Sequence, residues 1–370
     1  MEFLPEAAGP HDPILVTTAR LAGSVRRTTN IDTTRPDGLR ADARVDGRAR
    51  DVRTNPDGTT AVVGEAWLRA TVSPQQKLLS ITTSPDVPAL AQLLGASVGS
   101  GFRARFNDAL REAGAEADEC EEGSLLFLLL DDLPGATLVS GYVLHRAGLL
   151  DDPPVDADHE QPPPKRPLPD FGRMGDLCAG WAQDATMMVH VRSTGLIPVP
   201  VGPAAPVLER QDDPFSWHAM ADLPSLSVRR RRRLDLIAPD APGVPRAVHG
   251  IDLHFRDSHK GEDGVETVLH EYTVTGAADV GSGQIVSVAA RAQVLPWLEC
   301  PGAVASAARL AGMELSALRP TIRNEFVGRS TCTHLNDSLR SLADITALAR
   351  ELEQTPRTGA HTVMSNEVKR

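Results

Sequence analysis

The chain has 370 residues, of which 41% are hydrophobic and 24% are charged, so it can build two ordinary domains with apolar cores. Its formal net charge of −11 argues against a general binder of nucleic acid or anionic membranes. Aromatic residues make up only 4%, so we expect a substrate pocket lined mainly by aliphatic side chains. The sequence has no glycine-rich phosphate-binding fingerprint, so we expect no nucleotide cofactor.

These features predict a soluble, cytoplasmic protein. The longest apolar run, Leu125–Leu130, is far shorter than the roughly 20 residues that span a bilayer. The N-terminus shows neither a basic segment nor an apolar signal segment. The cysteines are too few and too widely spaced for a disulfide framework, so we expect reduced thiols at Cys120, Cys178, Cys300 and Cys332.

The chain divides into five segments. Residues 1–20 are expected to be a poorly structured lead-in, and residues 21–150 a first domain. Proline-rich sequence at 151–220 predicts a connector, with a short helix between Met174 and Val191. A second domain is expected at 221–355, followed by a tail at 356–370.

The second domain shows strands first and helices afterwards. Ile251–Ser258 alternates apolar and polar residues, which predicts a strand. The turn sequences GEDG (261–264) and DVGSG (279–283) predict hairpins into two further strands. Helices are expected at Ala303–Gly312 and Asn336–Leu352. This order predicts an α+β domain in which helices cover one face of an antiparallel sheet.

The two domains share short motifs in the same order along the chain. VDGRARD (from Val45) corresponds to IDLHFRD (from Ile251), and GEAWLRATV (from Gly64) to HEYTVTGAA (from His270). LFLLLDD (from Leu126) corresponds to TCTHLND (from Thr331). We therefore expect two diverged copies of one domain, packed as an internal pseudo-dimer, in a protein that is a monomer or a homodimer.

Side chains that suit a metal ion occur only in the second domain. His270, Cys300, Cys332 and His334 offer the imidazole and thiolate ligands that zinc prefers. Cys332 opens a predicted helix, where the helix dipole favours the thiolate. Two other interpretations stay open. Both cysteines can be small packing groups beside a helix-capping His334, or Cys332 can be a metal-free nucleophile with His334 as its base.

Two further groups are candidates for catalysis and substrate binding. His254, Asp257 and Glu271 lie on predicted strands and could transfer protons or orient a ligand, although a solvated strand face explains them too. Arg231, in the run Arg229–Arg233, and Arg323 are candidates to bind an anionic substrate. The alternatives are a solvated or salt-bridged edge strand for the run, nucleic-acid contacts, and a surface position for Arg323.

Several motifs of the second domain resemble a bacterial family, domain of unknown function 2889. They are IDLHFRDSHK from Ile251, LHEYTV from Leu269, the pair Cys300–Pro301, LAGMEL from Leu310 and TCTHL from Thr331. The first domain is similar to it at RRTTNID, AWLRATV and GASVGSGF, but lacks the histidine, the Cys-Pro pair and CTHL. The family implies no particular activity. A looser similarity to iron–sulfur scaffold proteins of the IscU and NifU type implies iron or an iron–sulfur cluster as the alternative to zinc.

The sequence thus predicts a metal-dependent enzyme, of lyase or hydrolase type, acting on a small organic acid or aromatic-derived substrate in bacterial catabolism. The alternatives are a non-catalytic metal or iron–sulfur scaffold and a metal-free protein that binds a small ligand. No nucleic-acid or membrane partner is expected.

Overall fold

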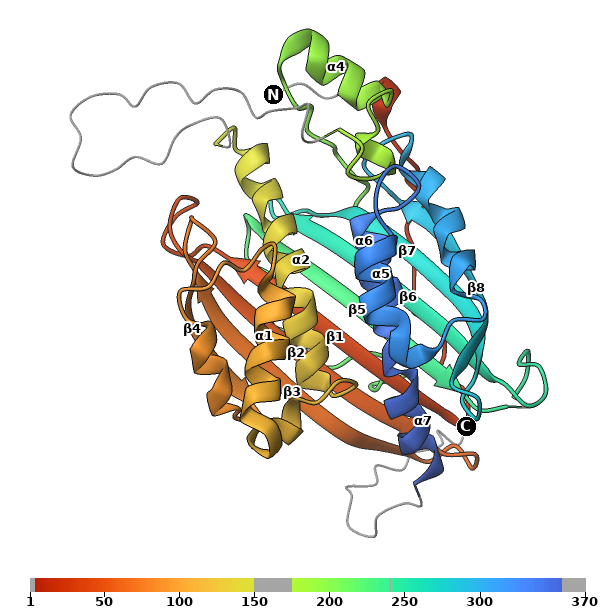
Figure 1. Ribbon diagram of the computed structural model, residues 1–370. Coiled ribbons are helices and arrows are strands. Elements are labelled where there is room, and N and C mark those ends of the chain that lie inside the picture. Colours follow the sequence, from red (N-terminus) through yellow and green to blue (C-terminus); the bar gives the residue numbers. More distant parts are fainter. Residues whose placement is uncertain (1–3, 150–174, 240, 355–370) are drawn as a thin grey trace.

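The computed structural model describes residues 4–149, 175–239 and 241–354 (Figure 1). The tail expected at 356–370 and the part of the connector before residue 175, including Met174, lie outside the described residues.

One antiparallel sheet of eight strands organises the molecule, and helices lie across one of its faces (Figure 1). The strand order is β4-β3-β2-β1-β5-β6-β7-β8. Strands β1 and β5 are far apart in sequence but pair at the centre, so the sheet runs through both halves of the chain. The strands are β1 (Ser24–Thr34), β2 (Ala43–Thr54), β3 (Thr60–Val72), β4 (Leu78–Ser84), β5 (Ser227–Ile237), β6 (His249–Lys260), β7 (Glu266–Asp279) and β8 (Gln284–Val294).

The α+β class is confirmed, and so are the predicted hairpins of the second half. GEDG connects β6 to β7 and DVGSG connects β7 to β8. Each turn ends on a glycine in the left-handed region, Gly264 (φ 78°) and Gly283 (φ 72°), where a Cβ would be strained. Turn chemistry and alternation therefore fix these strands locally.

Five of the described α-helices pack on one face of the sheet (Figure 1). They are α1 (Phe102–Ala113), α2 (Leu125–Arg146), α5 (Leu318–Glu325), α6 (Thr333–Arg340) and α7 (Ile345–Glu353). The helix expected at Ala303–Gly312 is instead the 3₁₀ segment η5 (Cys300–Leu310). The single helix expected at Asn336–Leu352 is divided into α6 and α7 by the 3₁₀ turn η7 (Ser341–Asp344). In the connector, α4 (Thr186–Thr194) begins later than predicted, after the 3₁₀ turn η4 (Ala179–Trp181).

Helix α2 has a sharp start and an apolar body. The side chain of Ser124 caps it by accepting a hydrogen bond from the Phe127 amide at 3.1 Å. By length and composition α2 could cross a membrane, but 83% of its most apolar window is buried inside the molecule. That burial is typical of the core helix of a soluble domain.

Residues 4–20 of the expected lead-in 1–20 are ordered, which differs from the poorly structured segment that the sequence predicts. Ala8 and His11 form β-bridges to Trp297 and Val294, so this segment extends along the outer edge of β8. Further on, the Ile14 amide donates a 2.8 Å hydrogen bond to Glu271 on the sheet face that the helices leave open.

The two largest apolar cores lie under the helices, and a buried ionic seam joins them. One core is built around β2, β3, α1 and α2, and the other around β6, β7, η5 and α6. The ionic seam consists of buried ion pairs on the helix-covered face, such as Arg232–Asp132 and Arg340–Asp131 at 3.1 Å, which join the two halves. All five arginines of the run Arg229–Arg233 are buried, but only Arg230 and Arg232 belong to this seam, because alternate strand residues point to the opposite face. The edge-strand interpretation is wrong, because β5 pairs with neighbours on both sides.

Candidate metal centre and adjoining cavity

A cluster of three ligand-type side chains forms where β6, β7 and α6 meet. Its potential ligand atoms, one each from Asp257, His270 and His334, all lie within 4.8 Å of one another. A β-bulge after Asp257 sets this residue opposite His270 in the register of β6 and β7. His334 comes from the first turn of α6.

The two imidazole rings are stacked and neutral. Their centroids are 3.5 Å apart with an interplanar angle of 17°. Burial holds the pKa of His270 well below its ordinary value, and His334 lowers it further. Burial, followed by the nearby Arg230, lowers the pKa of His334 to about 3. Neutral imidazole is the form that binds a metal ion.

Asp257 is held in place by an arginine and lies beside both histidines. Arg230 donates to its two carboxylate oxygens at 2.8 and 3.1 Å. The second of these oxygens, Oδ2, is 3.8 Å from His270 Nδ1 and 3.8 Å from His334 Nε2. A carboxylate has about four lone-pair positions, so Asp257 can accept from Arg230 and still bind a cation.

The donor set fits a borderline metal ion such as zinc. His270 Nδ1 is buried and has no hydrogen-bond partner among the described residues. Ligands of a tetrahedral zinc stand roughly 3.3 Å apart, which is slightly closer than the two 3.8 Å separations. A ring nitrogen directs its lone pair in the ring plane, so the parallel rings must tilt apart to share one ion.

The cysteines lie near this cluster in buried surroundings that favour the thiol form. Cys332 Sγ is 3.8 Å from His334 Nδ1, and Cys332 is the N-cap residue of α6. We expected a thiolate there, but burial raises the pKa of Cys332 and raises that of Cys300 well above its usual value. Cys178, which the sequence did not place near the site, influences the pKa of Cys300 as well, so three thiols from distant segments gather beside Tyr272.

His254 and Glu271 lie on the opposite face of the sheet from the cluster. Successive strand residues alternate between faces, and each of these two is displaced by an odd number from a cluster residue. Glu271 accepts hydrogen bonds from His254 and Arg256 at 2.6 Å each. Of the three predicted proton-transfer residues, only Asp257 therefore lies with the predicted metal ligands.

Arg231 is also on that opposite face, where it pairs with Glu209 at 3.0 Å and is buried.

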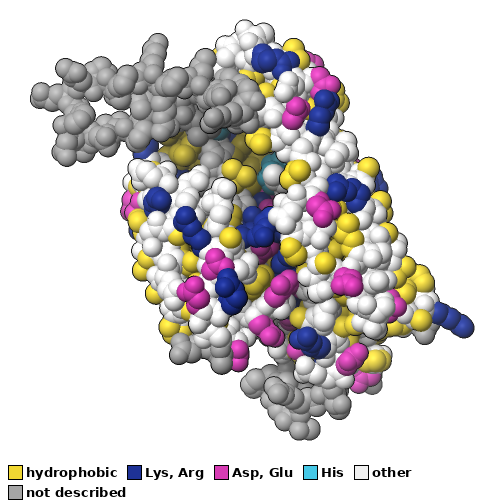
Figure 2. Space-filling view, in the orientation of Figure 1, with side chains coloured by type: hydrophobic (Ala, Val, Ile, Leu, Met, Phe, Trp, Pro, Cys, Tyr) yellow, Lys and Arg dark blue, Asp and Glu magenta, His cyan; other side chains and the backbone are white. Residues whose placement is uncertain are grey.

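Arg323, by contrast, lines a cavity of about 830 Å³ between α1 and α2 on one side and α5 and α6 on the other. Figure 2 shows this hollow between the helices, with Lys and Arg side chains gathered along it. We call it the furrow cavity.

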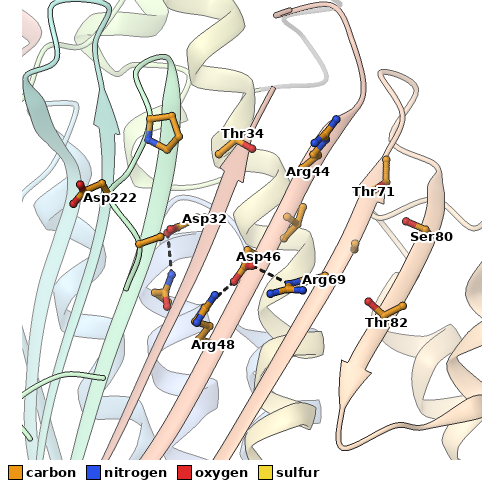
Figure 3. Close-up of a pocket in the computed structure, with 15 residues that line it drawn as sticks. Asp32, Thr34, Arg44, Asp46, Arg48, Arg69, Thr71, Ser80, Thr82 and Asp222 are labelled. Atoms are coloured by element: carbon orange, nitrogen blue, oxygen red, sulfur yellow. Dashed lines mark hydrogen bonds and ion pairs between the residues drawn. The ribbon is translucent and has the colours of Figure 1, made fainter. Parts of the chain in front are cut away.

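A second hollow, of about 390 Å³, lies on the open sheet face of the first half (Figure 3). Most of its charged side chains are already matched. Asp46 binds Arg48 at 3.0 Å and Arg69 at 3.2 Å, and these side chains are partly exposed to water. We interpret it as a solvated strand face, because exposed pairs of this kind are ordinary surface features.

The comparisons with known proteins concern the second half of the chain. No curated protein and no solved structure matches the sequence. Residues 228–348 match the family model described as "Protein of unknown function (DUF2889)". This stretch runs from β5 to α7 and includes every member of the histidine–aspartate cluster, and the match supports its assignment to the DUF2889 family.

Proposed function

We propose that Asp257, His270 and His334 bind a divalent transition-metal ion, most simply zinc. We propose further that the protein is a metal-dependent enzyme of lyase or hydrolase type for a small organic acid or aromatic-derived substrate. The observation that carries the proposal is the meeting of three donor groups from three elements, with the buried Nδ1 of His270 left without a partner among the described residues. Two histidines and a carboxylate also suit ferrous iron, which is the second candidate metal.

The residues around the cluster have distinct roles in this proposal. A bound ion would polarise a substrate carbonyl or make a bound water more acidic. Arg230 fixes Asp257 by a two-point contact and also binds Asp337 at 2.7 Å. Because Asp337 lines the furrow cavity, Arg230 links the cluster to the space where a substrate would lie. The donor cluster consists of one carboxylate and two imidazoles without a cysteine, which favours this proposal over an iron–sulfur scaffold held by thiolates.

We also propose that the molecule arose by duplication and works as an internal pseudo-dimer. Strands β1–β4 and β5–β8 follow mirrored orders from the centre of the sheet. A β-bulge follows Asp51 in the first half and Asp257 in the second, and each aspartate binds an arginine of the neighbouring central strand.

The β1–β5 contact also has the reciprocal form of a two-fold interface. Arg26 of β1 pairs with Asp235 of β5 at 2.7 Å, and Arg229 of β5 pairs with Asp32 of β1 at 2.6 Å. Each arginine thus contacts the aspartate that stands in the equivalent place on the other strand, as at an interface between identical subunits.

Metal analysis of the purified chain tests the proposed site. We expect near one zinc or iron per chain in the wild type, and loss of the metal in His270→Gln and His334→Gln. His254→Gln is the matched control, because it removes a buried histidine from the same strands on the opposite face. Circular dichroism should show that all three variants remain folded.

The same experiment has clear contrary outcomes. The metal centre would be ruled out if wild-type protein, purified without chelator, contained no metal and also bound none when zinc was added. Equal metal content in His334→Gln and His254→Gln would place any bound metal elsewhere. Proton NMR of the imidazoles adds a structural readout, since zinc must open the stacked pair of rings.

A further inference from the structure

The furrow cavity combines exposed apolar side chains with a net positive lining, in which three arginines stand against Asp176 and Asp337. Three of its lining residues are large hydrophobic side chains that are more than half exposed: Leu138 (60%), Leu177 (55%) and Val327 (63%). Scattered exposed hydrophobic residues are normal, but three around one concave site form a surface that an apolar ligand can cover.

The charges that line the furrow cavity are not all matched. Arg103 and Arg340 also line it, but both are held by Asp131 and Asp337 of the ionic seam. Arg323, in the last turn of α5, has no ion-pair or hydrogen-bond partner among the described residues. Its guanidinium can therefore bind an anion through two parallel hydrogen bonds.

The opposite wall of the furrow cavity adds polar donors from the first half. Helix α1 begins after Gly101 (φ 83°), and no side chain caps it. Its first-turn residues Arg103 and Ala104 line the cavity, so the N-terminal end of α1 forms part of this wall. The site is thus built from both halves of the chain.

We propose that the furrow cavity binds a small organic anion with an apolar body, such as an aromatic carboxylate, with the anionic group on Arg323. The apolar body lies against Leu138, Leu177 and Val327. The cavity volume of about 830 Å³ is ample for one ring system with a short acidic side chain. Identifying this ligand as the substrate rests on the proposed function, whereas binding of the anion does not.

Two fluorescent probes that share one ring system test this proposal on the full-length protein. They are 8-anilinonaphthalene-1-sulfonate, which is an anion, and N-phenyl-1-naphthylamine, which lacks the sulfonate. We expect Arg323→Gln to weaken binding of the anionic probe about tenfold, the effect of one charge-assisted contact. The same substitution should leave binding of the neutral probe unchanged.

Two variants make the result specific. Arg105→Gln removes an exposed arginine of α1 that does not line the cavity, and it should change neither affinity. Leu138→Ser should weaken both probes. The proposal is overturned if Arg323→Gln and Arg105→Gln have equal effects, or if the wild type binds the anionic probe no more tightly than the neutral one.

Metal content measured on the same preparations separates the two proposals. Selective anion binding without metal would keep the cavity assignment and remove the metalloenzyme. Metal without dependence on Arg323 would do the reverse.

Discussion

The two halves of the sheet hold the same arginine–aspartate pair at a β-bulge, but different side chains stand next to it. In the first half Asp51 is opposite Gly64, and Leu125 of α2 packs over that glycine. In the second half Asp257 is opposite His270, whose ring stacks on His334 of α6. The pair therefore occurs with and without histidines, which indicates that it serves the fold in both halves. Among the described residues next to these two pairs, histidines stand only beside the pair of the second half.

The largest expected effect tests whether the arginine–aspartate pairs are structural in both halves. Arg27 binds Asp51 and Asp344, and Arg230 binds Asp257 and Asp337. Asp344 also binds Arg319, and Asp337 also binds Arg340, so Arg27→Met leaves Asp51 and Arg230→Met leaves Asp257 as the buried carboxylate that loses its arginine. Each substitution should therefore lower the free energy of unfolding by about 3–5 kcal/mol.

Urea denaturation of chelator-treated protein measures this loss without any contribution from bound metal. Arg44→Met is the control, because its pair with Asp37 is exposed (62% and 66%) and should matter by less than about 1 kcal/mol. If Arg230→Met cost no more than Arg44→Met, the ionic seam would not stabilise the fold.

A smaller effect is expected when the first half is given the histidine of the second. A Cβ at Gly64 would lie 3.2 Å from Leu125 Cδ1, so the imidazole of Gly64→His must displace that side chain. Overpacking of this kind should cost about 1–3 kcal/mol in thermal or urea unfolding. The double variant Gly64→His/Leu125→Ala should be less destabilised than the two single changes added together. If the two changes in the free energy of unfolding were strictly additive, Leu125 would not be the side chain that obstructs position 64.

The third prediction concerns the open face of β1, which the connector covers. His218 contacts Thr28 Oγ1 at 2.9 Å and Asn30 Oδ1 at 2.7 Å, and burial lowers its pKa to about 3. Below about pH 6.5 the unfolded chain takes up a proton that the folded chain does not, so stability falls as pH falls. The slope from this residue is at most about 1.4 kcal/mol per pH unit.

His218→Gln should flatten this dependence between pH 7 and pH 5 in urea unfolding, and His11→Gln, an exposed histidine, should not. An unchanged slope in His218→Gln would mean that the connector does not hold this histidine in its buried place.

The sequence predicts the strands of the second half well because their turns and alternation are local signals. Gly264 and Gly283 mark the hairpin turns directly. The division between α6 and α7 is not local. Asp344 lies at this division, and it is buried and binds Arg27 and Arg319 from elsewhere in the fold, which no helical periodicity reveals.

The candidate site was only partly predictable for a similar reason. His270 and His334 were selected by residue type, and the structure brings them together. Alternation along the strands places His254 and Glu271 on the opposite face from Asp257 and His270, but only the folded structure shows which face the helices cover. A run of arginines suggests an exposed edge, but each arginine of the run pairs with an aspartate or glutamate from another segment, such as Asp32 for Arg229. Such pairing appears only when the chain is folded.

The N-terminal segment covers the edge of β8 and should thereby prevent self-association of the protein through this strand. The Leu295 amide donates to the Pro10 carbonyl at 3.1 Å and the Asp12 amide to the Gln293 carbonyl at 2.9 Å, so the edge of β8 is already hydrogen-bonded there. An uncovered edge strand is a template for aggregation. A chain that lacks residues 1–12 should therefore self-associate in light scattering. Gly9→Leu should do so as well, because a Cβ at Gly9 would lie 2.4 Å from the Leu295 carbonyl oxygen and would push the segment away from the edge.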